Sequence, residues 1–123
     1  MLRTDQVKLL AELGFIALMR NMDDNARKIF KGVEAARPEQ EAAAIGLAML
    51  DLKTNNIDSA IDRLKKFSSS EKALTFLGLA FFRKGETAKA VKVLNDAISI
   101  GENTEASTLA KDILQAIANE QGA

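Results

Sequence analysis

The chain has 123 residues, enough for one domain whose compact form buries about two-thirds of the surface that the unfolded chain exposes. Seventeen Lys and Arg residues balance seventeen Asp and Glu residues, so no net charge attracts nucleic acid or anionic lipid. The absence of His and Cys removes the commonest general base and metal ligand, together with thiolate chemistry, so we predict no enzyme activity, no catalytic residue, no cofactor and no metal site.

Composition and periodicity both favour helices. The chain is rich in Ala, Leu, Glu and Lys and contains a single Pro. Pro38 is expected to open the third helix, and Ser68 with Glu71 forms a potential capping box before the fifth. No apolar stretch approaches the ~20 residues that a membrane span requires. We predict seven helices over residues 5–20, 23–36, 38–54, 57–67, 71–83, 86–100 and 105–119.

The order of small and large residues typical of tetratricopeptide repeats appears twice. Small residues let two helices approach closely, and large residues fill the space beside them. The first copy is Leu10-x2-Leu13-Gly14-x2-Ala17, followed by Ala26-x3-Phe30 and Pro38. The second copy is Leu74-x2-Leu77-Gly78-x2-Phe81, followed by Ala90-x3-Leu94 and Ala97.

A third copy lies between these two and can be aligned in two registers. Its second helix carries Ala60-x3-Leu64. Either Ala48 or Gly46 could occupy the glycine position of its first helix. We favour Ala48, which keeps the usual separation from Ala60 and puts Asp51 at the normally aromatic site, close to the helix end where water can reach it.

The fold class that follows is all-α. We predict a tetratricopeptide-like right-handed superhelix in which three degenerate helix-turn-helix repeats precede a C-terminal capping helix. The capping helix is amphipathic, with Leu109, Ile113, Leu114 and Ile117 on one stripe. The whole chain, 1–123, is expected to form this single domain. The predicted repeats cover about 7–40, 41–70 and 71–103, and the capping helix covers 104–119.

The first helix of each repeat is expected to line a concave surface, and this lining is where a partner would bind. Its centre is apolar and its edges are charged. An apolar groove with two Met residues suits the apolar stripe of an amphipathic helix on a client protein. The predicted partner-binding residues are Ala11, Phe15, Leu18, Met19, Ile45, Met49, Leu52, Thr75, Leu79 and Phe82.

Three alternatives to an open client groove stay open at this point. The C-terminal helix could fold back, so that Phe15, Met49 and Phe82 are core residues. A homodimer could bury the concave face on its twin. The chain could also be a generic scaffold or adaptor that mediates protein assembly through polar contacts. Nucleic acid and membrane are not expected partners in any of these cases.

The sequence resembles the small tetratricopeptide chaperones of bacterial type III secretion systems, particularly those that hold the needle subunit. The likeness lies in Val7–Leu13, Asn56–Ala60 and Phe81–Gly85 and in the short closing helix. Chaperones of pore-forming translocators typically have an additional N-terminal helical region, whereas the first repeat here starts within a few residues of Met1. The resemblance therefore favours the needle-subunit type.

This resemblance implies a cytoplasmic bacterial chaperone. It would hold the amphipathic C-terminal helix of a needle subunit in the concave groove and prevent premature assembly, commonly with a second small co-chaperone. Binding the monomer, rather than any reaction, would block polymerisation.

Overall fold

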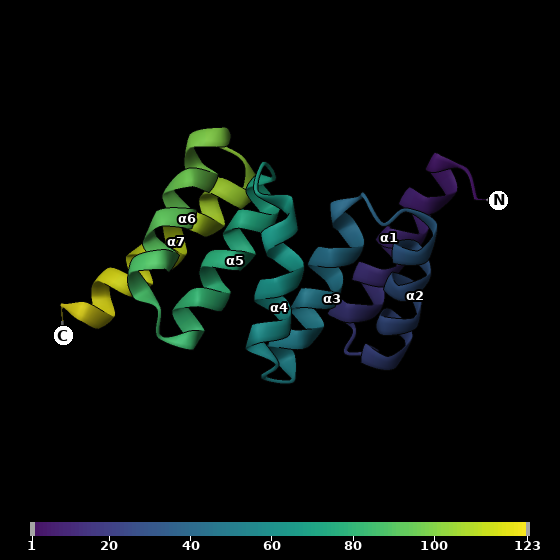
Figure 1. Ribbon diagram of the computed structural model, residues 1–123, viewed down its shortest axis with the longest axis horizontal. Helices are drawn as coiled ribbons and strands as arrows, with labels where there is room; N and C mark the ends of the chain where they lie inside the picture. Colours follow the sequence, from purple (N-terminus) through teal and green to yellow (C-terminus); the bar gives the residue numbers. More distant parts are fainter. Residues whose placement is uncertain (1, 123) are drawn as a thin grey trace.

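The computed structural model describes residues 2–122, which form seven α-helices, one short 3₁₀ turn and no strand within that range (Figure 1). The all-α prediction is confirmed. The helices are α1 (Thr4–Met19), α2 (Asp23–Ala36), α3 (Glu41–Lys53), α4 (Ile57–Leu64), α5 (Glu71–Lys84), α6 (Thr87–Ile100) and α7 (Glu105–Gln121), and the 3₁₀ turn is η1 (Lys65–Phe67).

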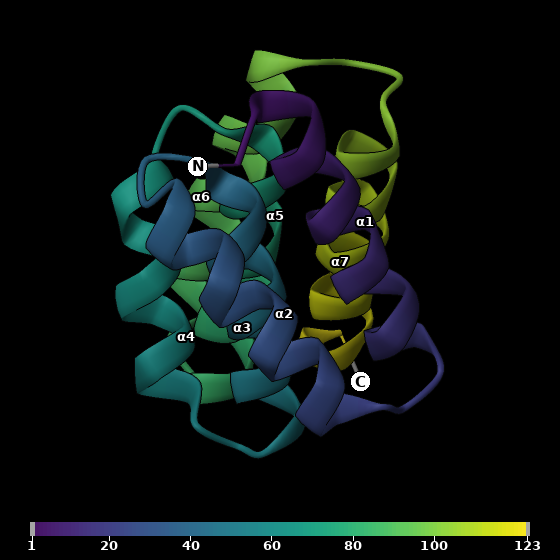
Figure 2. The same cartoon turned by 90° about the vertical axis from the view of Figure 1, so that its right-hand side faces the viewer.

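The helices stack in the order of the sequence. Helices α1 and α2, α3 and α4, and α5 and α6 pack as successive hairpins, and α7 packs against α5 and α6 at the C-terminal end (Figure 1). The odd-numbered helices also contact one another in a row, α1 with α3, α3 with α5 and α5 with α7. Figure 2, a view along the stack, separates α1 and α7 on one side from α2 and α4 on the other. This is the predicted tetratricopeptide-like arrangement of three hairpins and a capping helix.

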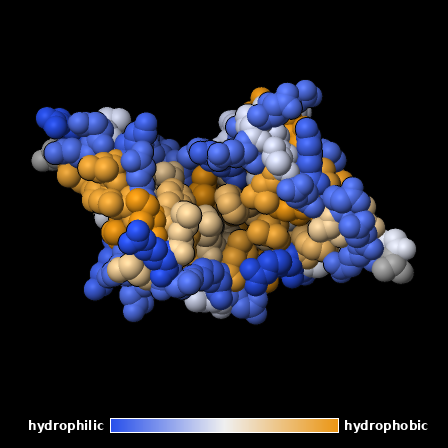
Figure 3. All heavy atoms as spheres, turned by 180° about the vertical axis from the view of Figure 1, so that it is seen from behind, coloured by the Kyte–Doolittle hydropathy of each residue, from blue (hydrophilic) through white to orange (hydrophobic). Residues whose placement is uncertain are grey.

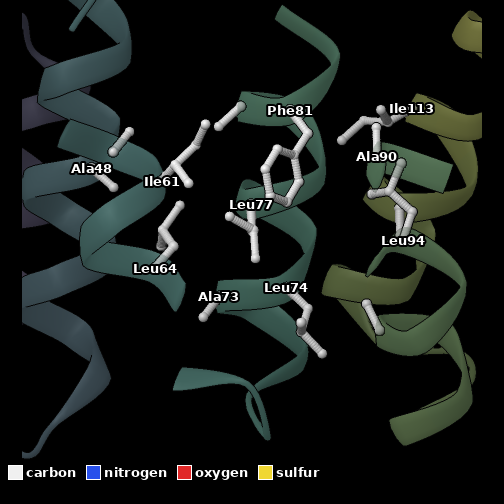
Figure 4. Packing of buried hydrophobic residues seen from close by; sticks show 14 of the residues in the cluster. Ala48, Ile61, Leu64, Ala73, Leu74, Leu77, Phe81, Ala90, Leu94 and Ile113 are labelled. Carbon is white, nitrogen blue, oxygen red and sulfur yellow. The ribbon is translucent and has the colours of Figure 1, made fainter. Parts of the chain in front are cut away.

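Small residues bring the two helices of the third hairpin together. A Cβ atom added to Gly78 of α5 would collide with the side chain of Leu94 of α6, so Leu94 occupies the space that the glycine leaves. Leu74, Leu77 and Phe81 extend this core toward α4 and α6 (Figure 4). All four of these large residues are buried. The sequence motif thus marks the contacts that pack α5 between its neighbours.

In the second hairpin, Ala48 takes the place that Gly78 has in the third. Ala48 is fully buried and belongs to the same core cluster as Ala60 and Leu64, as the favoured register requires. Gly46, the alternative, instead faces the preceding hairpin, where a Cβ atom would collide with the ring of Phe30.

Phe30 joins the first hairpin to the second. Its ring is fully buried, and a Cβ atom added to Gly14 would lie 2.8 Å from it. On α3 the ring covers Gly46, and the ring of Phe15 meets it edge-on with 4.8 Å between centroids. Two glycines on different helices therefore provide the space for one aromatic side chain.

The three hairpin turns share one backbone device. Asn21, Asn55 and Gly85 stand at equivalent positions after α1, α3 and α5, and all three have positive φ angles of 59°, 62° and 90°. Glycine and asparagine adopt this left-handed conformation at the lowest cost, which explains why they occur where the chain reverses direction between two helices.

Asp51 does not lie where water reaches it, contrary to the sequence-based expectation. Its side chain is buried and accepts hydrogen bonds from Arg63 Nε at 3.1 Å and from Ser59 Oγ at 2.9 Å. Arg63 also forms an ion pair with Glu34 at 3.2 Å. This position of the repeat is normally aromatic. Here Asp51 occupies it, and the guanidinium group of Arg63 from α4 compensates the buried carboxylate charge.

One helix start and one helix cap differ from the sequence-based expectation. Helix α3 begins at Glu41 rather than at Pro38, because Gln40 still has an extended backbone and serves as its N-cap. Helix α5 is capped by Ser70, whose hydroxyl accepts a hydrogen bond from the Ala73 N–H, and not by Ser68. Helix α4 ends at Leu64 and the chain tightens into η1, so the regular α-helix stops before its predicted end at residue 67.

The glycine pocket of Phe30 leads to a first prediction. We expect Gly46→Ala to destabilise the protein by about 2 kcal/mol, because the new methyl group collides with the Phe30 ring in a close-packed core. Gly32→Ala is the matched control, since its Cβ meets no atom within 4 Å on the exposed side of α2. Helix propensity alone should make that control about 0.5–1 kcal/mol more stable. Urea unfolding measures both; equal effects would contradict the role of Gly46.

Candidate functional site

The odd-numbered helices present one shared surface, which we call the inner face. On α5, residues Lys72, Phe76, Leu79 and Arg83 recur with the spacing of a single helix face. Figure 3 views the molecule from behind and shows apolar residues gathered along the middle of a hollowed surface, with hydrophilic residues along its two borders. The inner face therefore offers an apolar floor between polar edges.

The ten predicted partner-binding residues differ in how accessible they are. Ala11, Leu18, Ile45, Leu52 and Thr75 are buried between neighbouring helices, whereas Phe15, Met49, Leu79 and Phe82 are half-buried. Met19 is 82% exposed. Five residues of this set are therefore accessible to a partner: Phe15, Met19, Met49, Leu79 and Phe82. Met19 lies at the end of α1.

Thr75 lies in the interior and not on the lining of a groove. Its hydroxyl donates to the Glu71 carbonyl at 2.8 Å or to the Ala106 carbonyl at 3.3 Å, so it is covered by α7. Sequence reasoning placed it on the lining because it could not include the contact between α5 and α7.

The half-buried residues rest on the core with one side and face outward with the other. Phe15 and Met49 pack against the cluster that contains Phe30, and Leu79 and Phe82 pack against the larger cluster of α3 to α7. Helix α7 stands beyond α6 and does not fold back over α1 and α3 (Figure 1). Helix α7 therefore does not cover Phe15 and Met49, as the first of the three alternatives requires, although it contacts α5, the helix that carries Phe82.

Sequence reasoning missed a pocket between α5 and α7. It has a volume of about 150 Å³, and its apolar wall contains Phe76, Ala106 and Leu109. Lys72 and Glu105 stand at its polar edge. Phe76 could have been found from its spacing to Leu79, but Leu109 looked like part of the buried stripe of the capping helix.

Two of the charged residues at the edge of the inner face hold the hairpin turns. Lys53 Nζ donates to Asp23 Oδ1 at 2.7 Å and to Asn21 Oδ1 at 3.2 Å. Arg83 Nη1 donates to the Leu52 carbonyl at 2.8 Å. These cations tie successive hairpins together, which limits their freedom to bind a partner's carboxylate.

Within 2–122, no group of three acidic side chains is arranged to hold a metal ion. Lys84 on α5 forms an ion pair with Asp58 at 2.9 Å, and this hydrogen bond and charge raise the pKa of its ammonium group above the ordinary value. In the same part of the chain, no helix combines the length and apolar character that crossing a bilayer requires.

Comparison with known proteins identifies the fold. No family model and no curated protein sequence matches the chain. The crystal structure of the Yersinia enterocolitica type III secretion translocator chaperone SycD, in an alternative dimer, matches with a TM-score of 0.80. The match covers 98% of this chain and 98% of that chain at 20% sequence identity. The shared fold extends over the whole helical stack.

We expect substitutions on the inner face to lower the free energy of unfolding in proportion to how deeply the replaced side chain is packed. We expect Met19→Glu to change the free energy of unfolding by less than about 0.5 kcal/mol, because this side chain is largely in water. Phe15→Glu should cost about 2 kcal/mol, because it removes the edge-on contact with Phe30. Thermal and urea unfolding test both variants, and a large loss for Met19→Glu would contradict its exposed placement.

Proposed function

We propose that this protein is a binding chaperone of a type III secretion system and that its inner face holds an apolar helix of a secreted client. The observation that carries the proposal is the row of half-buried apolar residues, Phe15, Met49, Leu79 and Phe82, on one surface of the stack. An apolar surface of this kind normally marks a partner site in a soluble protein. The shared fold with a translocator chaperone supports the same role.

The shape and chemistry of the inner face suit a helix more than an extended or charged peptide. Its floor is apolar across several helices, so it matches the apolar stripe of an amphipathic helix. Met19 and Met49 can adapt to irregular side chains. The pocket beside Phe76 and Leu109 would accept one large apolar side chain and fix the position of the helix.

A client of this type would be protected by binding alone. A secreted subunit that assembles through an apolar helix cannot polymerise while that helix is covered, and mass action shifts it toward the bound monomer. This role requires no catalytic group. We infer that it is carried out in the bacterial cytoplasm, where a secreted client is made.

Two observations bear on the class of client, and they point to different classes. The sequence resemblance favours a needle subunit, but the matched structure is that of a translocator chaperone. The comparison therefore supports a translocator client and lends no support to a needle subunit or to a co-chaperone. We take a translocator as the first client to test and a needle subunit as the second. The same likeness is compatible with a homodimer, since the matched structure is described as a dimer.

The test is direct binding with a variant of the inner face. We expect Leu79→Glu to weaken the complex with the client at least about tenfold, because a charge replaces an apolar contact at its centre. Ile100→Glu is the matched control, since Ile100 is 50% exposed at the end of α6 and outside the inner face. Co-expression with each candidate, followed by isothermal titration of the purified pair, gives the affinities.

Circular dichroism must show the same helicity for both variants and the wild type. Retention of a translocator or a needle subunit identifies the client class. If Leu79→Glu leaves binding intact, the client binds a surface other than the inner face. A wild-type protein that binds neither class would favour the generic scaffold.

A further inference from the structure

Two lysines occupy the same position of the repeat at one border of the inner face. When Gly14 of α1 is aligned with Gly78 of α5, Lys8 falls on Lys72. Lys72 begins the row of α5 residues that belongs to the inner face, so Lys8 begins the matching row on α1. The same position on α3, between them, is held by Ala42. We call the border at the starts of α1, α3 and α5 the loop border.

The ammonium groups of both lysines are available to a partner. Lys8 and Lys72 are exposed, and within residues 2–122 neither forms an ion pair. Glu12 lies one turn after Lys8, and Glu105 lines the same pocket as Lys72, but neither of these carboxylates is paired with its neighbouring lysine. The described part of the chain therefore leaves both charges without a bound carboxylate.

The cations of the opposite border are bound within the chain. That border lies at the ends of the odd-numbered helices and carries Lys53 and Arg83. Lys53 is paired with Asp23, and Arg83 donates to the Leu52 carbonyl. The two borders of the inner face thus differ, because a carboxylate of a partner finds unbound lysines at the loop border.

Lys72 also stands where its own helix disfavours a cation. It lies in the first turn of α5, and the first turn of a helix carries a partial positive charge. Glu71 precedes it, but that carboxylate accepts a hydrogen bond from Thr104 Oγ1 at 3.2 Å and forms no ion pair with Lys72. A lysine in this place gains from a carboxylate that a partner brings. Local choices that conflict with their surroundings are expected at functional sites.

We propose that Lys8 and Lys72 bind two carboxylates on one flank of the client helix, so that the client has Asp or Glu beside its apolar stripe. The inference rests on the proposed function, because it requires a helix that lies across the inner face. Lys72 lines the pocket that contains Phe76 and Leu109, so a client side chain in this pocket brings its neighbours close to the ammonium group. Opposite charges at the edge of an apolar contact select the partner and fix its register.

The stack sets the distance between the two carboxylates. Helix α1 packs against α3, and α3 packs against α5, so two helix-to-helix spacings separate Lys8 from Lys72. At 8–10 Å for each spacing, this amounts to roughly 16–20 Å. A client helix that rises ~1.5 Å per residue covers this distance in about eleven to thirteen residues. Residues about eleven positions apart lie on the same side of a helix, three turns from each other. The lysines therefore fit a pair of acidic residues with that spacing.

Binding of two synthetic peptides to the full chain tests this spacing. Both peptides are amphipathic helices with the same leucine stripe and two Glu residues on one flank. The Glu residues are about eleven positions apart in the first peptide and about four apart in the second. We expect fluorescence anisotropy at low salt to show about fivefold tighter binding of the first peptide, because it alone reaches both lysines. The difference should shrink at high ionic strength. Circular dichroism checks that the two peptides are equally helical.

Variants of the protein assign the effect to the two lysines. Lys8→Gln combined with Lys72→Gln should weaken binding of the first peptide about tenfold. Lys28→Gln combined with Lys31→Gln is the matched control, since these exposed lysines on α2 change the net charge equally and lie outside the inner face. The control should leave the affinity unchanged.

The outcomes separate this inference from the proposed function. Equal affinities for the two peptides, or equal effects of the two double variants, would overturn the role of the lysines. If Leu79→Glu still weakens peptide binding in that case, the apolar inner face keeps its proposed function. If the wild type binds neither peptide, the inner face does not hold an amphipathic helix, and the proposed function fails together with the inference.

Discussion

The geometry of the first half of the stack depends on the absence of side chains at Gly14 and Gly46. The Phe30 ring from α2 fills the space between α1 and α3, and either methyl group would collide with it. Because close-packed interiors relax only in part, this one ring sets how near α1 lies to α3. Phe15 and Met49 of the inner face both pack against the cluster that contains this ring. The candidate binding surface is built on that contact.

The chain leaves two apolar surfaces uncovered, and they have different origins. The inner face arises because the odd-numbered helices form a row whose outward side is not covered by a further helix within residues 2–122. The second surface consists of Leu9, Leu13 and Ile16 on α1, which no other helix of residues 2–122 covers, whereas α7 covers part of α5 and α6. Exposing either surface to water costs stability, and a partner that covers the surface offsets this cost.

Several charged residues connect elements of the stack. Arg63 from α4 binds the buried Asp51 and also reaches Glu34 of α2. Lys53 joins α3 to the first turn, and Arg83 joins α5 to the end of α3. The Arg63–Asp51 pair lies within the second hairpin, whereas the other three interactions span two hairpins and help to hold the orientation of successive repeats on which the inner face depends.

Local patterns in the sequence determined the number of helices, their approximate limits, the repeat motif and the capping helix, because helix spacing and the alternation of small and large residues are properties of neighbouring positions. Only the tertiary structure decided that Thr75 is covered by α7, that Asp51 is buried beside Arg63, and that Phe76 and Leu109 form a pocket. It also decided which apolar residues stay exposed, since burial depends on helices far apart in the sequence. Periodicity shows that a helix has an apolar face; only the packed neighbours show whether that face is covered.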